Sequence, residues 1–134
     1  MAKLIDIKGI GETYASKLAE LNISTQEELL KAGTAPKDRQ NIADKTGISK
    51  KLILRWLNMA DLARIGGIDE ACANLLEHAG VDTVPELAQR NAKNLFAKMQ
   101  EVNEEKKAVK EMPSEEEVAT WVNEAKNLPR AINY

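Results

Sequence analysis

The 134-residue sequence contains one cysteine and one histidine, which is too few for several kinds of chemistry. A single cysteine, Cys72, excludes an internal disulfide, and Cys72 with His78 provides too few sulfur and nitrogen ligands for a zinc site. No carboxylate pair lies in a recognisable catalytic motif. We therefore expect no enzyme, no metal site and no cofactor, and we place Cys72 in the core and His78 at the surface.

Long apolar runs and a targeting pattern are also missing. No stretch approaches the roughly 20 consecutive apolar residues that cross a bilayer, and the first residues lack the charged and apolar regions of a signal peptide. Hydrophobic residues make up 43% of the sequence, which is ordinary for a globular protein. These features predict one cytoplasmic domain, residues 1–134, that does not bind membranes.

Charge is nearly balanced overall but differs between the two halves. The net charge is −2, yet residues 1–65 hold 11 basic and 8 acidic side chains, while residues 66–134 hold 8 basic and 13 acidic ones. Such asymmetry indicates that the first half is the better partner for a polyanion. A mixed, solvated surface without a polyanionic partner is the alternative interpretation.

What the sequence does contain is a glycine-rich stretch followed by apolar residues at helical spacing. Residues 7–11, the first glycine turn, read Ile-Lys-Gly-Ile-Gly. Glycines allow a close approach to the backbone, and the N–H groups at the start of the following helix point outward, as in anion sites. Glu12, an acid at the helix start, opposes this. The residues predicted to contact phosphate are Lys8, Gly9, Ile10, Gly11 and Lys17.

The same pattern returns 58 positions later in residues 65–69, the second glycine turn, which read Ile-Gly-Gly-Ile-Asp. A further correspondence, offset by 65, sets Trp56 against Trp121. The chain therefore reads as two repeats, about 1–64 and 65–134. In the second repeat, Asp69 and Glu70 place negative charge where a phosphate would bind. A structural role is expected for Arg64, Gly66, Gly67 and Asp69.

Capping and glycine signals predict an all-α protein with about eight helices and no strand. Thr25 and Ser114 lie three residues before glutamates, as in capping boxes, while Gly33 and Gly47 end helices. The helices are expected at about residues 12–21, 26–33, 36–47, 50–63, 70–79, from Thr83 onward, 91–110 (one helix or two joined ones) and 115–128.

The first repeat has too few residues before its glycine turn for a leading helix. We expect the C-terminal helix, residues 115–127, to pack back on residues 1–6 and to supply it. Trp121 would then support the first glycine turn, as Trp56 would support the second, in one compact pseudo-twofold domain. A swapped dimer, in which another chain donates this helix, is the alternative to a monomer.

Basic residues of the first half form a second candidate DNA contact. The spacing of residues 39–56 resembles the helix-turn-helix of bacterial regulators, in which Lys50, Lys51 and Arg55 would enter a major groove. We favour a sequence-neutral patch that assists backbone binding, because the same helix is needed to support the second glycine turn. The patch consists of Lys37, Arg39, Lys50, Lys51 and Arg55.

Residues 7–18 resemble the hairpin and second helix of a helix-hairpin-helix motif, as found in the N-terminal domain of RecA-related recombinases and the C-terminal domain of the RNA polymerase α subunit. Over nearly its whole length the chain is similar to small bacterial tandem helix-hairpin-helix proteins, filed as a domain of unknown function. The resemblance implies two helix-hairpin-helix repeats and leaves function open. We expect a sequence-nonspecific DNA-binding module that contacts the DNA backbone. The alternative is a protein-interaction or scaffold module with an unidentified protein partner.

Overall fold

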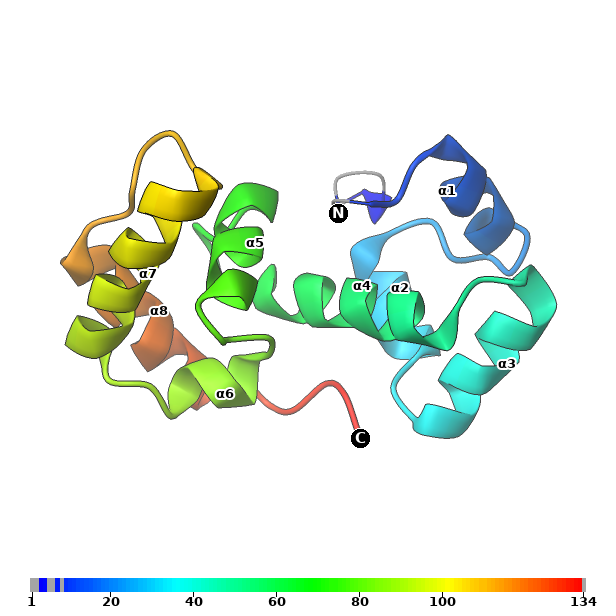
Figure 1. Cartoon of the computed structure of the whole chain (residues 1–134). Helices are drawn as coiled ribbons and strands as arrows, with labels where there is room; N and C mark the ends of the chain where they lie inside the picture. The colour runs from blue at the N-terminus through cyan, green and yellow to red at the C-terminus, as the bar shows by residue number, and fades with distance from the viewer. Residues whose placement is uncertain (1–2, 5–6, 8, 134) are drawn as a thin grey trace. The chain divides into compact units, whose positions relative to one another are not determined.

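The computed structural model describes residues 3–4, 7 and 9–133, which form eight α-helices and no strand. This confirms the all-α prediction. One isolated antiparallel bridge joins Lys3 to Thr25. The helices, labelled in Figure 1, are α1 (Glu12–Ala19), α2 (Gln26–Ala32), α3 (Pro36–Thr46), α4 (Lys50–Leu62), α5 (Glu70–His78), α6 (Val84–Ala88), α7 (Ala92–Lys106) and α8 (Glu115–Asn127).

The chain divides into two compact units. The first contains residues 1–61 and 131–134, and the second contains residues 62–130. The division at the end of α4 lies close to the repeat boundary predicted at residues 64–65. The C-terminal residues return to the first unit, so that unit is not continuous in sequence. The pseudo-twofold relation between the repeats stays a prediction.

Capping residues define the helices of the first unit. The Glu28 N–H donates to Thr25 Oγ1 at 3.1 Å, and the Thr25 N–H donates to Glu28 Oε1 at 3.1 Å, which completes the predicted capping box of α2. Gly47 ends α3 with a left-handed φ of 75°. Apolar side chains at helical spacing then meet in a core whose fully buried members are Leu18, Leu29, Ile53, Trp56 and Leu57.

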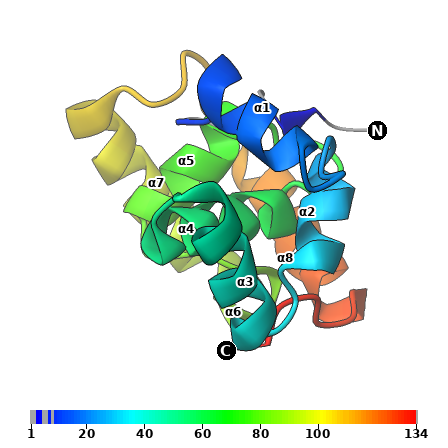
Figure 2. The same cartoon turned by 90° about the vertical axis from the view of Figure 1, so that its right-hand side faces the viewer.

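The second unit is built around α8, which packs against α6 and α7, while α5 packs against α7. Figures 1 and 2 show these helices from two sides. The predicted capping box of α8 is present, with the Glu117 N–H donating to Ser114 Oγ at 3.1 Å. Val118 and Trp121 lie on the buried face of α8.

Helix α7 ends at Lys106, earlier than the predicted position near residue 110. Lys107 adopts a left-handed conformation with φ 50°. The Asn103 side chain holds the following turn, because its Oδ1 accepts from the Val109 N–H at 3.0 Å and its Nδ2 donates to the Val109 carbonyl at 3.2 Å. A side chain that bonds the backbone in this way competes with helix continuation.

Local geometry recurs at the offset of 58 residues. Gly9 and Gly67 have φ angles of 99° and 92°. The Ile10 N–H donates to the Ile7 carbonyl at 3.1 Å, and the Ile68 N–H donates to the Ile65 carbonyl at 3.2 Å. The two glycine turns therefore share a positive φ at the glycine and the same hydrogen bond between two buried isoleucines.

The packing partners of the C-terminal helix differ from those expected. Trp121 lies beneath Gly67 of the second glycine turn, and Trp56 lies beneath Gly9 of the first. The predicted exchange of tryptophans between repeats is therefore wrong. α8 belongs to the second unit, and the part of the C-terminus that joins the first unit is the segment after residue 130. Residues 1–2 and 5–6, on which α8 was expected to pack, lie outside the described residues.

Candidate nucleic-acid interface

The first glycine turn has an exposed glycine and is anchored to the core by buried apolar side chains. Ile7 and Ile10 are each only 3% exposed, while Gly9 between them is exposed. Gly9 has a φ of 99°, a region that side chains with a Cβ rarely adopt. The chain then passes through Gly11 in an extended conformation and enters α1. This path places the first residues of α1, Glu12 and Thr13, at the surface.

Among the described residues, no side chain bonds the free N–H groups at the start of α1. The N-cap residue is Gly11, and no side-chain hydrogen bond caps the helix. A Cβ at Gly11 would meet no atom within 4 Å. Free N–H groups at a helix start carry a partial positive charge and favour an anion. Glu12 in the first turn is exposed, and its negative charge disfavours an anion at this helix start.

The start of α5 in the second unit offers a direct comparison. Asp69 at its N-cap has φ −90° and ψ −176°, and Gly11 has φ −92° and ψ −177°. The Asp69 carboxylate accepts a hydrogen bond from the Cys72 N–H at 2.8 Å. A carboxylate of the chain itself therefore occupies the position at α5 that no described side chain occupies at α1. Asp69 thus caps α5, and the purely structural role of the second glycine turn stays a prediction.

A tryptophan supports each turn from the core side. The Trp56 indole Nε1 lies 3.6 Å from the position a Cβ on Gly9 would occupy, and Trp121 Nε1 lies 3.1 Å from that position on Gly67. Tyr14 on α1 packs against Trp56 with ring centroids 5.2 Å apart. Trp56 Nε1 is buried without a hydrogen-bond acceptor among the described residues.

The predicted cations lie at different distances from the first turn. Arg55 Nη1 lies 3.7 Å from the Cβ position of Gly9, so α4 brings a guanidinium directly beside the turn. Lys17 lies in the last turn of α1, about 7.5 Å along the helix axis from Glu12. Lys8 lies outside the described residues.

The basic patch predicted for the first half is smaller than expected. Lys37, Lys50 and Lys51 are exposed. Arg39 is only 3% exposed and donates from Nη1 to the Gly33 and Thr34 carbonyls at 2.8 and 3.1 Å. Placing Arg39 in the patch was wrong, because its guanidinium is committed to backbone carbonyls in the interior. The Arg39 side chain points inward from α3, although the residues around it in the sequence look like those around a surface arginine.

At the second glycine turn, Gly66 and Gly67 are exposed and Arg64 is half-buried. Cys72 is half-buried, whereas we expected it to lie in the core. Burial, and then the charge of Asp69, raise the pKa of the Cys72 thiol to about 11. Its thiol is therefore protonated at neutral pH. His78 is exposed, as expected.

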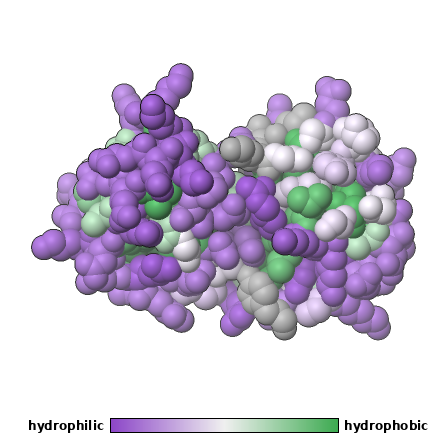
Figure 3. Space-filling model, viewed as in Figure 1, coloured by the Kyte–Doolittle hydropathy of each residue, from purple (hydrophilic) through white to green (hydrophobic). Residues whose placement is uncertain are grey.

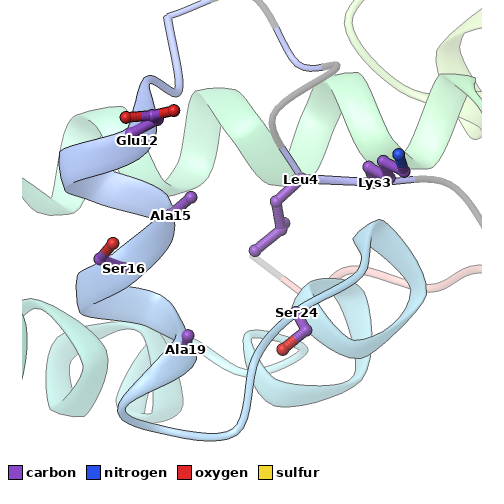
Figure 4. A pocket seen from close by; sticks show the side chains of 7 residues that line it. All are labelled: Lys3, Leu4, Glu12, Ala15, Ser16, Ala19 and Ser24. Carbon is purple, nitrogen blue, oxygen red and sulfur yellow. The ribbon is translucent and has the colours of Figure 1, made fainter.

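A pocket of about 450 Å³ lies beside α1 in the first unit. Figure 4 shows Ala15 and Ala19 on the side of α1 that faces Leu4, with Ser24 below. Figure 3 shows hydrophobic residues gathered on the visible face of the same unit, whereas the second unit is mostly hydrophilic in that view. The sequence did not reveal this pocket, because small side chains on a helix give no signal of an open face. Its lining residues are Lys3, Leu4, Glu12, Ala15, Ser16, Ala19 and Ser24.

Within the described part of the chain, no three histidine, cysteine or acidic residues gather as metal ligands, and no helix is long and apolar enough to cross a membrane. A sequence model of the family described as a domain of unknown function (DUF4332) matches residues 8–128. No curated protein and no solved structure matches the chain.

Proposed function

We propose that this chain, which belongs to the family described as a domain of unknown function (DUF4332), is a sequence-nonspecific DNA-binding module. The first glycine turn and the start of α1 contact a backbone phosphate. The observation that carries the proposal is the difference between two helix starts with the same backbone. Asp69 fills the anion position at α5, whereas Gly11 has no side chain to fill the corresponding position at α1, and no other described side chain bonds there.

Backbone N–H groups at α1 would bind phosphate oxygens, and the missing side chains at Gly9 and Gly11 would let the phosphate approach. Arg55 beside Gly9 supplies the nearest described positive charge. Exposed Lys50 and Lys51 lie one to two turns earlier on α4 and extend the positive surface. Contacts of this kind hold the backbone and carry no base information, which makes the binding sequence-independent.

The affinity should be modest. Glu12 places a negative charge at the helix start, and the net charge of the chain is −2. Of the two helices that follow glycine turns, only α1 lacks a side-chain cap among the described residues, so few phosphates are neutralised by one copy. Because each neutralised phosphate contributes a slope of about −0.9 to log K against log salt, the dependence should correspond to one to three phosphates. Micromolar binding at low salt is the expected range.

A protein-interaction module is the second candidate. Three consecutive acidic residues, Glu115, Glu116 and Glu117, are exposed in the first turn of α8. They lie at the start of α8, where they favour the helix, and they also form a surface that repels DNA. In this case the two glycine turns would only connect helices. The second half of the chain would then contact a basic protein partner.

The test is fluorescence anisotropy of a labelled duplex titrated with the full chain at low and moderate salt. The Lys8→Glu/Lys17→Glu variant should abolish binding by reversing charge near the first turn. The matched control, Lys93→Glu/Lys126→Glu, makes the same charge change at exposed positions of the second unit and should bind within about twofold of wild type at moderate salt. Absence of binding even at low salt would refute the DNA-binding proposal.

A further inference from the structure

Residues 131–133, which we call the tail, bind to a site in the first unit. We call this site the seat; it is formed by Gly33 and Thr34 at the end of α2 and by Arg39 of α3. The Asn133 N–H donates to the Thr34 carbonyl at 2.8 Å, and the Asn133 carbonyl accepts from Arg39 Nη2 at 2.8 Å. Ile132 between them is only 2% exposed. The segment is therefore held by one buried aliphatic side chain and by a donor and an acceptor of its backbone.

The seat has its own supports besides the tail. Arg39 Nη1 donates to the Gly33 and Thr34 carbonyls, which fix the guanidinium at the end of α2. Gly33 is packed so closely that a Cβ there would lie 2.8 Å from Leu57 Cδ1 of α4. These contacts do not involve residues 131–133. The seat is thus prepared by α2, α3 and α4, and the tail fills it.

The tail can leave this seat without unwinding a helix. α8 ends at Asn127, and residues 129–133 have no regular secondary structure. Pro129 and Arg130, which precede the seated segment, are exposed. A short segment without regular secondary structure, bound through one side chain and its backbone, is a common form of peptide ligand. The tail has that form, although it is part of the same chain.

We propose that the seat is a peptide-binding site, which the chain's own tail occupies in the absence of a partner. Its partner is an extended protein segment with a branched aliphatic residue, followed by a residue whose backbone N–H and carbonyl pair with Thr34 and Arg39. The seat holds one apolar side chain and otherwise contacts the backbone of the bound segment. The aliphatic residue of the partner therefore sets the specificity. The tail competes with the partner at the high effective concentration that a covalent tether provides.

The test uses a fluorescent synthetic peptide with the sequence of residues 128–134 as the probe. In the full-length Ile132→Asp variant, a charge replaces the buried aliphatic side chain, so the tail leaves and the seat is free. This variant should bind the peptide at least about tenfold more tightly than wild type, in which the tail competes. A peptide carrying aspartate in place of isoleucine is the matched control and should not bind.

The Arg39→Met/Ile132→Asp double variant should lose the peptide binding gained by Ile132→Asp. Folding is checked by circular dichroism. If Ile132→Asp is folded and does not bind the peptide, the proposal is overturned. If Ile132→Asp unfolds, excess peptide should restore its helical signal in trans, and failure to do so also overturns the proposal. DNA binding does not enter this experiment, so its outcome is independent of the function proposed above.

Discussion

Gly11 and Asp69 begin equivalent helices in the same backbone conformation, and only Asp69 has a side chain that bonds the helix start. The Asp69 carboxylate accepts from the Cys72 N–H at 2.8 Å, while α1 has no side-chain cap. Aspartate is among the best N-cap residues, and glycine is a weaker one. The first repeat thus gives up some helix stability at a position where the second repeat gains it. Such a loss is expected where a helix start must stay open for a ligand.

The Gly9→Ala substitution should destabilise the protein. Gly9 has a φ of 99°, and its Cβ would lie 3.6 Å from Trp56 Nε1. A left-handed conformation costs a residue with a side chain about 1–3 kcal/mol. Gly66→Ala is the control, because a Cβ there meets no atom within 4 Å and its φ is not positive. Urea unfolding should show a loss for Gly9→Ala and a change below about 0.5 kcal/mol for Gly66→Ala. Equal stability of the two variants would show that the turn tolerates a side chain.

Neutralising Glu12 should strengthen DNA binding. Glu12 lies in the first turn of α1, next to the open helix start. The Glu12→Gln variant removes this charge and should raise the affinity by roughly threefold to tenfold at low salt, less at high salt. Glu70→Gln makes the same change at the closed start of α5 and should have little effect. If both variants gain equally, net charge rather than the first turn determines the affinity.

Cys72 should be unreactive toward iodoacetamide at neutral pH. Burial, and secondarily Asp69, raise the pKa of its thiol from the ordinary 9.0 to about 11. Because the thiolate is the reactive form, the alkylation rate should rise about tenfold per pH unit up to about pH 11. The raised pKa favours the folded state fully below pH 9, and this contribution is lost between about pH 9 and pH 11.

The Asp69→Asn variant separates the effect of burial on the pKa of Cys72 from the effect of the Asp69 charge. Asparagine still caps α5 but removes the charge next to the thiol. The pKa of Cys72 should fall, and the alkylation rate at pH 8 should rise, while thermal stability changes little. An unchanged rate profile would mean that burial alone raises the pKa.

Arg39 should be needed for stability and not for DNA binding. The Arg39→Met variant keeps the aliphatic stem but leaves the Gly33, Thr34 and Asn133 carbonyls without their guanidinium donor. A loss of about 2–4 kcal/mol of unfolding free energy is expected in urea. Lys37→Met on the same helix removes an exposed charge and should change stability by less than about 0.5 kcal/mol. If Arg39→Met were as stable as wild type, its buried hydrogen bonds would carry little energy.

Local signals in the sequence predicted the helices well. The capping boxes at Thr25 and Ser114 and the stop at Gly47 depend on residues at most three or four positions apart, so the sequence contains the whole interaction. The conformations of the two glycine turns follow for the same reason. The open start of α1 was also predictable, because glycine cannot cap a helix through a side chain.

Long-range contacts were not predictable in this way. Arg39 bonds to Asn133, 94 residues away, and nothing local distinguishes it from a surface arginine such as those expected in a basic patch. The tryptophan assignment failed because two repeats of the same pattern make either helix an acceptable support for either turn. Local spacing cannot choose between them. The early end of α7 depends on a side-chain turn at Asn103, which helix propensity does not show.

The most direct test of the account exchanges the two N-cap residues, using Gly11→Asp and Asp69→Gly. Both positions have extended backbone that either residue adopts, so neither change strains the turn. Duplex binding is measured by fluorescence anisotropy at low salt. We predict that Gly11→Asp weakens binding at least about tenfold by placing a carboxylate at the open helix start, and that Asp69→Gly leaves it equal or stronger. Unchanged binding by a folded Gly11→Asp variant would contradict the central claim that the start of α1 holds the phosphate.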